Sequence, residues 1–138
     1  MKIRIDFVTN SSSSSFIIAL KDVVKEPDFE NIPVWAKKLI KNYFVMITRS
    51  DNPDRDIIYT VEELEKYFYD NYGAKPEEIN KDSWMKGRFK KMKKAIESGY
   101  NVCNISVDYS DETGNAFFAG LPKKDDGCGF YLLDSDDY

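Results

Sequence analysis

Apolar and charged residues alternate at the start of the chain, where Ile3, Ile5 and Phe7 are separated by Arg4 and Asp6. A period of two predicts a strand over residues 2–8. Polar residues fill positions 9–15, and an apolar run over 16–20 follows at once. The simplest interpretation is an N-terminal hairpin, in which a serine loop joins the first strand to a second strand that is buried on both faces.

The middle of the chain has the spacing of amphipathic helices. A first helix is predicted over about 33–47, because Pro33 suits a first helical turn and apolar residues recur every four positions after it. A second helix is predicted over 60–72, where Thr60 and Glu63 have the spacing of a capping box and Gly73 provides a stop. The apolar face of the first helix consists of Trp35, Leu39, Tyr43 and Ile47. The apolar face of the second consists of Val61, Leu64, Phe68 and Tyr72.

The pattern returns from helix to strand in the last third of the chain. Pro76 is placed to begin a further helical turn, and Asn80 or Asp82 can begin a longer helix that ends near Gly99. Strict alternation then predicts a strand over 103–109, followed by turn residues at 111–115 and a hairpin partner at 116–119. A loop leads to a last strand over 130–133. The apolar face of the long helix is Met85, Phe89, Met92 and Ile96.

These elements predict a single α+β domain over residues 1–138 that ends in an acidic tail, 134–138. Its antiparallel sheet would combine the N-terminal hairpin with the C-terminal strands, and about three helices would pack on one face. The length suffices to bury a core without disulfides. Aromatic residues make up 14% of the chain, so either an aromatic-rich core or a tyrosine-rich interaction surface is expected.

Several classes of function are disfavoured by residues that the sequence lacks. The chain has no histidine, and its two cysteines, Cys103 and Cys128, lie in different segments, so neither a zinc site nor the usual Ser/His or Cys/His catalytic pairing is expected. The carboxylates of Asp108, Asp111 and Glu112 could hold Mg²⁺ or Ca²⁺, but the residues around them are typical of a hairpin turn and lack the spacing of an EF-hand. We therefore expect no metal, no cofactor and no catalytic residues. Without an export signal or a long apolar run, we expect a cytoplasmic protein with no membrane contact. In that compartment two reduced thiols are favoured over a disulfide between Cys103 and Cys128.

The stretch of residues 7–17, FVTNSSSSSFI, resembles an N-terminal signature at the start of otherwise dissimilar small proteins of Firmicutes and their phages. The resemblance covers the N-terminal residues alone, and no activity is attached to that group. It implies, by association, a protein encoded by a phage or mobile element that modulates a host or defence macromolecule. It implies no reaction, cofactor or site residue.

Negative charge is concentrated at the C-terminal end. Residues 100–138 carry eight acidic residues against two lysines, a net charge of −6, whereas the whole chain carries −4. An acidic surface can engage a basic surface of another protein. The first hypothesis is therefore a small non-enzymatic interaction protein that binds a macromolecular partner. Its partner-binding residues would be Asp134, Asp136, Asp137 and Tyr138.

The serine loop supports a second hypothesis, a domain that binds a phosphate or nucleotide ligand. Successive backbone N–H groups and hydroxyls can cradle an anion, although the glycines and lysine of a phosphate loop are absent. Lysines of the basic helix over 81–94 would supply the missing charge. The candidate ligand-binding residues are Asn10, Ser11, Ser12, Ser13, Ser14, Ser15, Lys90 and Lys94. The alternative without a ligand is a loop whose serine hydroxyls form hydrogen bonds with nearby backbone groups.

The same basic helix could also lie along a nucleic-acid backbone. The acidic balance of the chain as a whole opposes this, and a solvated helix face is the better interpretation of the lysines. The sequence therefore favours another protein as the partner over nucleic acid.

Overall fold

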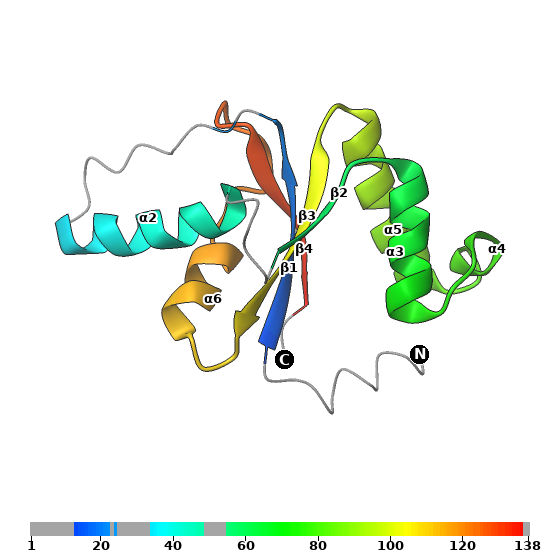
Figure 1. The fold of residues 1–138 in the computed structure, drawn as a ribbon, viewed down its shortest axis with the longest axis horizontal. Helices are drawn as coiled ribbons and strands as arrows, with labels where there is room; N and C mark the ends of the chain where they lie inside the picture. The colour runs from blue at the N-terminus through cyan, green and yellow to red at the C-terminus, as the bar shows by residue number, and fades with distance from the viewer. Residues whose placement is uncertain (1–12, 23, 25–33, 49–54, 137–138) are drawn as a thin grey trace.

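A computed structural model describes residues 13–22, 24, 34–48 and 55–136 (Figure 1). These residues form one four-stranded antiparallel sheet with the order β2-β3-β1-β4. The strands are β1 (Ser13–Leu20), β2 (Arg55–Ile58), β3 (Asn101–Asp108) and β4 (Phe130–Asp136). The predicted α+β class and antiparallel sheet are confirmed.

Strand β1 lies in the middle of the sheet. It pairs with β3 from Ser13 to Leu20 and with β4 from Ser15 to Leu20, with one register shift between Ile17 and Ile18 on the β4 side. Both edges of β1 are therefore occupied by strands that lie far away in the sequence. The predicted hairpin is wrong for its second strand, because no edge of 16–20 is left to pair with a first strand. The predicted first strand, residues 2–8, lies outside the described residues.

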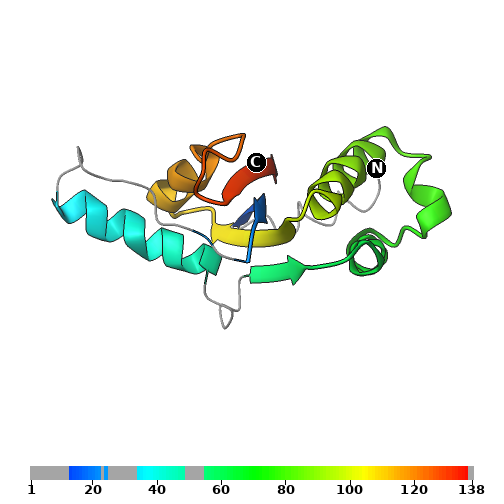
Figure 2. The ribbon, with the colours of Figure 1, turned by 90° about the horizontal axis from the view of Figure 1, so that it is seen from above.

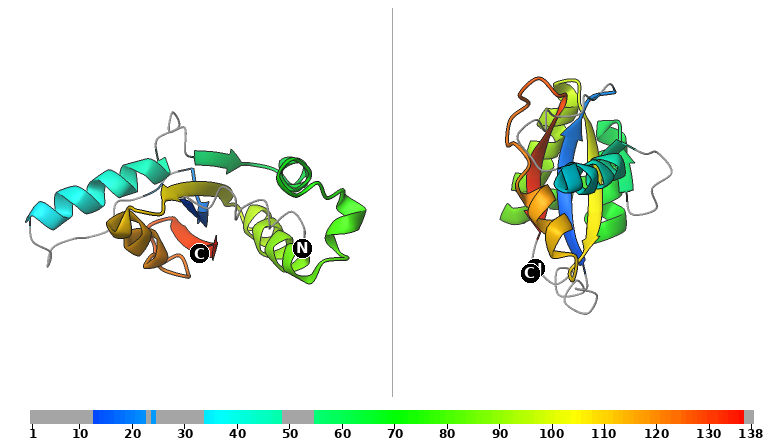
Figure 3. Two further views of the ribbon diagram at one scale, coloured as in Figure 1. Left: turned by 90° about the horizontal axis from the view of Figure 1, so that it is seen from below. Right: turned by 90° about the vertical axis from the view of Figure 1, so that its left-hand side faces the viewer.

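The helices lie on both faces of the sheet, as seen from above in Figure 2 and from two further directions in Figure 3. One face carries α3 (Val61–Tyr72), α4 (Pro76–Ile79) and α5 (Ser83–Glu97), and the other carries α2 (Val34–Thr48) and α6 (Glu112–Ala119). The prediction of about three helices on one face is therefore wrong in number and in placement. The reason lies in β1, whose Ile17 and Ala19 face the α5 side while Phe16, Ile18 and Leu20 face the α2 side, so both faces need covering.

The predicted helix ends are confirmed where capping chemistry marked them. The Thr60 hydroxyl accepts the Glu63 N–H at 3.1 Å, while the Glu63 carboxylate accepts the Tyr59 N–H at 2.7 Å. Gly73 ends α3 with φ of 65°, a left-handed conformation that glycine adopts without strain. Of the two candidate caps for α5, Asp82 is the one used.

The segment predicted as a hairpin turn and strand, 111–119, is instead the helix α6. Asp111 begins it as the N-cap, because its carboxylate accepts the Gly114 N–H at 2.9 Å and also the Tyr43 hydroxyl at 2.9 Å. Asp, Gly and Asn are common both at helix N-termini and in hairpin turns. The sequence of 111–115 is therefore compatible with either structure, and the predicted hairpin turn was the wrong one. The tertiary bond from Tyr43 on α2 is what the sequence did not reveal.

Two helical glycines are expected to respond in opposite ways to alanine. At Gly114 a Cβ would press against the Asp111 carboxylate and lie 2.9 Å from the Tyr43 ring, whereas at Gly87 nothing lies within 4 Å. Gly87→Ala should therefore raise the free energy of unfolding by up to about 1 kcal/mol through helix propensity. Gly114→Ala should lower it by about 1–3 kcal/mol through overpacking. Urea denaturation of the two variants measures both effects, and equal signs would contradict this description of α6.

The predicted last strand is confirmed and is longer than expected. Strand β4 continues through Asp134, which pairs with Ile17, and Asp136, which pairs with Ser15. The predicted acidic tail is therefore wrong for 134–136, because these residues belong to the sheet. Residues 137 and 138 lie outside the described residues.

A hydrogen-bond network at the surface, centred on Asp125, fixes the loop that precedes β4. The Tyr100 hydroxyl donates to Asp125 at 2.7 Å, and the other carboxylate oxygen of Asp125 accepts the N–H groups of Gly127 and Gly129 at 2.9 Å each. The hydrogen bond to Asp125, together with burial, raises the pKa of Tyr100 to about 12. The bond from Tyr100, followed by the two backbone bonds, holds the pKa of Asp125 below its ordinary value.

These shifts predict how Tyr100→Phe changes stability with pH. The lowered pKa of Asp125 makes its contribution present above pH 3.8 and lost as the pH falls through its folded-state pKa. The raised pKa of Tyr100 makes its contribution complete below pH 10.0 and lost as the pH rises through about 12. The wild-type protein should therefore exceed Tyr100→Phe in stability at neutral pH, and the difference should shrink below pH 3.8. Denaturant titrations at several pH values measure it, and a constant difference would contradict the assignment.

Candidate functional site

The described part of the serine segment is a strand and not a loop. Ser13, Ser14 and Ser15 begin β1, and Ser14 is buried at 1% exposure with no hydrogen-bond partner for its hydroxyl oxygen among the described residues. In a strand, successive N–H groups point in opposite directions and cannot converge on one anion. The predicted loop is wrong for these three serines. Asn10, Ser11 and Ser12 lie outside the described residues, and ligand binding by 10–15 stays a prediction.

The basic helix α5 divides into a buried arginine and exposed lysines. Lys86, Lys90, Lys91, Lys93 and Lys94 are exposed, so Lys90 and Lys94 remain accessible as the second hypothesis requires. Arg88, which belongs to the same basic run over 81–94, is 3% exposed and does not lie on the solvated face. Its Nε donates to the Asp134 carboxylate at 3.1 Å, and its guanidinium lies 4.6 Å from the centre of the Trp84 ring. Sequence reasoning missed this because a buried arginine and a surface one look alike on a helical wheel.

The contact with Arg88 means that Asp134 is not simply part of an acidic surface available to a partner. Asp134 is an ion-pair partner inside the domain, with a side chain 27% exposed. Neutralising it would disturb the fold as well as any partner contact. Partner binding by Asp134, Asp136, Asp137 and Tyr138 stays a prediction, and Asp134 is a poor probe of it.

The remaining candidate carboxylates and cysteines form contacts that stabilise the fold. Asp108 caps the turn at Ser110, and Asp111 caps α6. Cys103 and Cys128 are both thiols; Cys103 is buried in β3, and the half-buried Cys128 packs against the same core cluster. Among the described residues no three acidic or cysteine side chains gather in a way that would hold a metal ion.

The most distinctive feature of the described surface is the outer edge of β2. Within the described part of the chain, β2 has a strand neighbour, β3, on one side only. The edge of β4, on the opposite side of the sheet, is partly covered, because the Leu132 N–H donates to the Pro122 carbonyl at 2.8 Å. An unpaired edge carries N–H and C=O groups that can pair with another chain.

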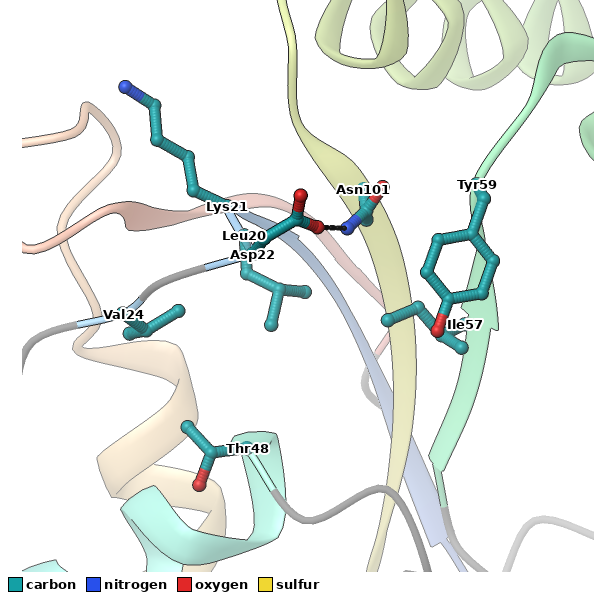
Figure 4. A pocket seen from close by; sticks show the side chains of 8 residues that line it. All are labelled: Leu20, Lys21, Asp22, Val24, Thr48, Ile57, Tyr59 and Asn101. Atoms are coloured by element: carbon teal, nitrogen blue, oxygen red, sulfur yellow. Dashed lines mark hydrogen bonds between the residues drawn. The ribbon is translucent and has the colours of Figure 1, made fainter.

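A cavity of about 390 Å³ lies beside β2 on the α2 side of the sheet (Figure 4). Its apolar side chains are Leu20, Val24 and Ile57, and Asn101 closes one wall by donating to the Asp22 carboxylate at 2.9 Å. The Lys21 side chain points away from it, toward the Tyr100 ring. Apolar and polar side chains therefore line this cavity in about equal measure.

A second hollow, of about 300 Å³, lies between β2 and α3 on the opposite side of the sheet. Three carboxylates line it, those of Asp56, Glu63 and Asp70, against the single ammonium group of Lys66. Lys66 is already paired with Asp70 at 3.0 Å. The hollow is therefore acidic.

Ile57 and Tyr59 line both hollows, so the two flank the same strand. Tyr59 is 52% exposed, and in Figure 4 its ring lies along β2 above Ile57. The β2 edge was missed from the sequence because residues 57–59 are too short a run to identify as a strand. We name Asp56, Ile57, Tyr59 and the two hollows the β2 edge site.

Comparison of the chain with protein families, with characterised proteins and with solved structures finds no match. The described helices include none that combines the length and apolar character of a membrane span. The class that the structure defines is thus an α+β domain with one antiparallel sheet between two helical layers.

Proposed function

We propose that this chain is a small non-enzymatic interaction protein that binds another protein along the β2 edge site. The observation that carries the proposal is a strand edge, open among the described residues, with a hollow on each side. Addition of a strand to a sheet edge is a recurrent way of binding peptides, in which the backbone gives affinity and flanking pockets give specificity.

Other features support a binding role. Tyr59, which lines both hollows, belongs to the residue types enriched at interfaces. The chain lacks histidine, the commonest general base, and several of its described carboxylates, among them Asp82, Asp108 and Asp111, cap helices and turns. The N-terminal resemblance supports a cytoplasmic protein of phage or mobile-element origin whose partner is a host or defence macromolecule.

Site-specific photocrosslinking in cells of the encoding organism tests the proposal. A benzoylphenylalanine placed at Tyr59 should give a discrete protein adduct. The matched control is Tyr109, which is 48% exposed against 52% for Tyr59 and lies beyond the other end of β3. Equal adducts at the two positions, or an adduct at Tyr109 alone, would contradict binding at the β2 edge site.

A further inference from the structure

We propose that the segment bound at the β2 edge site is an extended, basic stretch of the partner protein that pairs with β2 as a fifth strand. This inference rests on the proposed function and adds the chemistry of the occupant. It follows from the backbone of β2 and from the charges on one of its sides.

The backbone argument concerns the direction of the unpaired groups. All four residues of β2 are in register with β3, from Arg55 opposite Ile105 to Ile58 opposite Val102. In an antiparallel pair every second residue turns its N–H and C=O groups toward the other side. Two residues of β2 therefore present both groups outward, where an extended segment can pair with them whatever its sequence.

The side chains of an added strand would alternate between the two faces of the sheet, because successive residues of a strand point to opposite faces. On the α2 side their nearest neighbours would be Ile57 and Tyr59, which favour apolar or aromatic side chains. On the α3 side they would meet Asp56, Glu63 and Asp70. A strand that alternates apolar residues with lysine or arginine fits both sides.

The charge argument excludes an acidic occupant. The carboxylates of the α3 hollow outnumber its ammonium groups by three to one, and Lys66 already pairs with Asp70. Asp56 is exposed on β2 itself, next to the edge where the new strand would lie. Like charges facing each other across an interface disfavour the wrong partner, and opposite charges fix the register of the right one.

Three labelled octapeptides and the full-length protein test the inference by fluorescence anisotropy. The first alternates lysine with valine, the second alternates glutamate with valine, and the third is the lysine peptide with alternate backbone nitrogens methylated. We expect the lysine peptide to bind, the glutamate peptide not to bind, and methylation to weaken binding by about tenfold or more because it removes main-chain donors. Added salt should weaken binding of the lysine peptide.

Matched variants separate this site from general attraction to an acidic protein. Asp56→Asn with Asp70→Asn should weaken binding of the lysine peptide by about three- to tenfold, because two exposed charge contacts are lost. Glu62→Gln with Glu97→Gln makes the same change of charge at exposed positions that do not line the hollow, and should leave binding within about twofold. Each of these residues is exposed, so all four substitutions should leave the fold intact.

Several results would overturn the inference. Equal binding of the methylated peptide would mean attraction without strand pairing, and equal weakening by the two double variants would mean attraction without a site. A dimer of the unliganded protein in sedimentation experiments, dissociated by Asp56→Asn with Asp70→Asn, would make a second copy of this chain the occupant. A photocrosslink at Tyr59 without peptide binding would overturn this inference and leave the proposed function standing, whereas failure of both would remove both.

Discussion

Replacing Arg88 with methionine should lower the free energy of unfolding by about 3 kcal/mol, because it leaves the Asp134 carboxylate without its cation inside the domain. The Arg88 side chain is 3% exposed, and its guanidinium lies between Asp134 on β4 and the Trp84 ring on its own helix. Methionine keeps most of the apolar stem but supplies no charge. The Asp134 side chain is 27% exposed, so water offsets part of the loss and the expected value lies at the low end for a broken buried pair.

The control for Arg88→Met is the exposed Lys90→Met on the same helix, which should change stability by less than about 0.5 kcal/mol. The double variant Arg88→Met with Asp134→Leu should recover most of the loss, since an apolar pair can replace a buried ion pair at little cost. Urea denaturation monitored by far-UV circular dichroism measures all three. A double variant no more stable than Arg88→Met would contradict the ion-pair explanation.

The second large effect is expected at Phe118, on the helix that the sequence did not predict. Phe118→Ala should cost about 4 kcal/mol, the size usual for removing a buried ring. The side chain is fully buried, and its ring centre lies 5.4 Å from that of Phe16 and 5.0 Å from that of Phe117. It therefore joins α6 to the central strand of the sheet.

The adjacent Phe117 provides a comparison within the same helix. Its side chain is half-buried and stacks on Tyr43, with ring centres 5.6 Å apart, so Phe117→Ala should cost less than half as much as Phe118→Ala. Thermal and urea unfolding measure both variants. Similar costs would contradict the full burial of Phe118 and the half-buried position of Phe117.

Local chemistry explains which elements could be predicted from the sequence. Thr60, Asp82 and Gly73 act through bonds to residues a few positions away, and the helix ends that they mark were predicted. The pairing of β1 depends on residues about a hundred positions away, which no local pattern contains. The helix α6 was missed for the same reason, because its cap residue Asp111 is held by Tyr43 from α2.

The candidate site could not be predicted from the sequence, because it depends on the position of β2 at the edge of the sheet. Ile57 and Tyr59 are ordinary apolar residues in sequence, and they gain significance only when β2 is placed at the outside of the sheet. The acidic character of the site was also hidden, since Asp56, Glu63 and Asp70 lie in the part of the chain whose net charge is positive. The predicted charge asymmetry along the sequence therefore did not locate the acidic hollow in space.

The central position of β1 affects how the chain is made. Residues 16–20 leave the ribosome early, yet their partners lie at 101–108 and 130–136. At ordinary rates of translation these apolar residues wait on the order of ten seconds before the sheet can close. Pairing between such distant segments is also slow to search for. The interval of greatest risk of aggregation is thus determined by the rate of synthesis and by chaperones near the ribosome, and stabilising the finished protein would not shorten it.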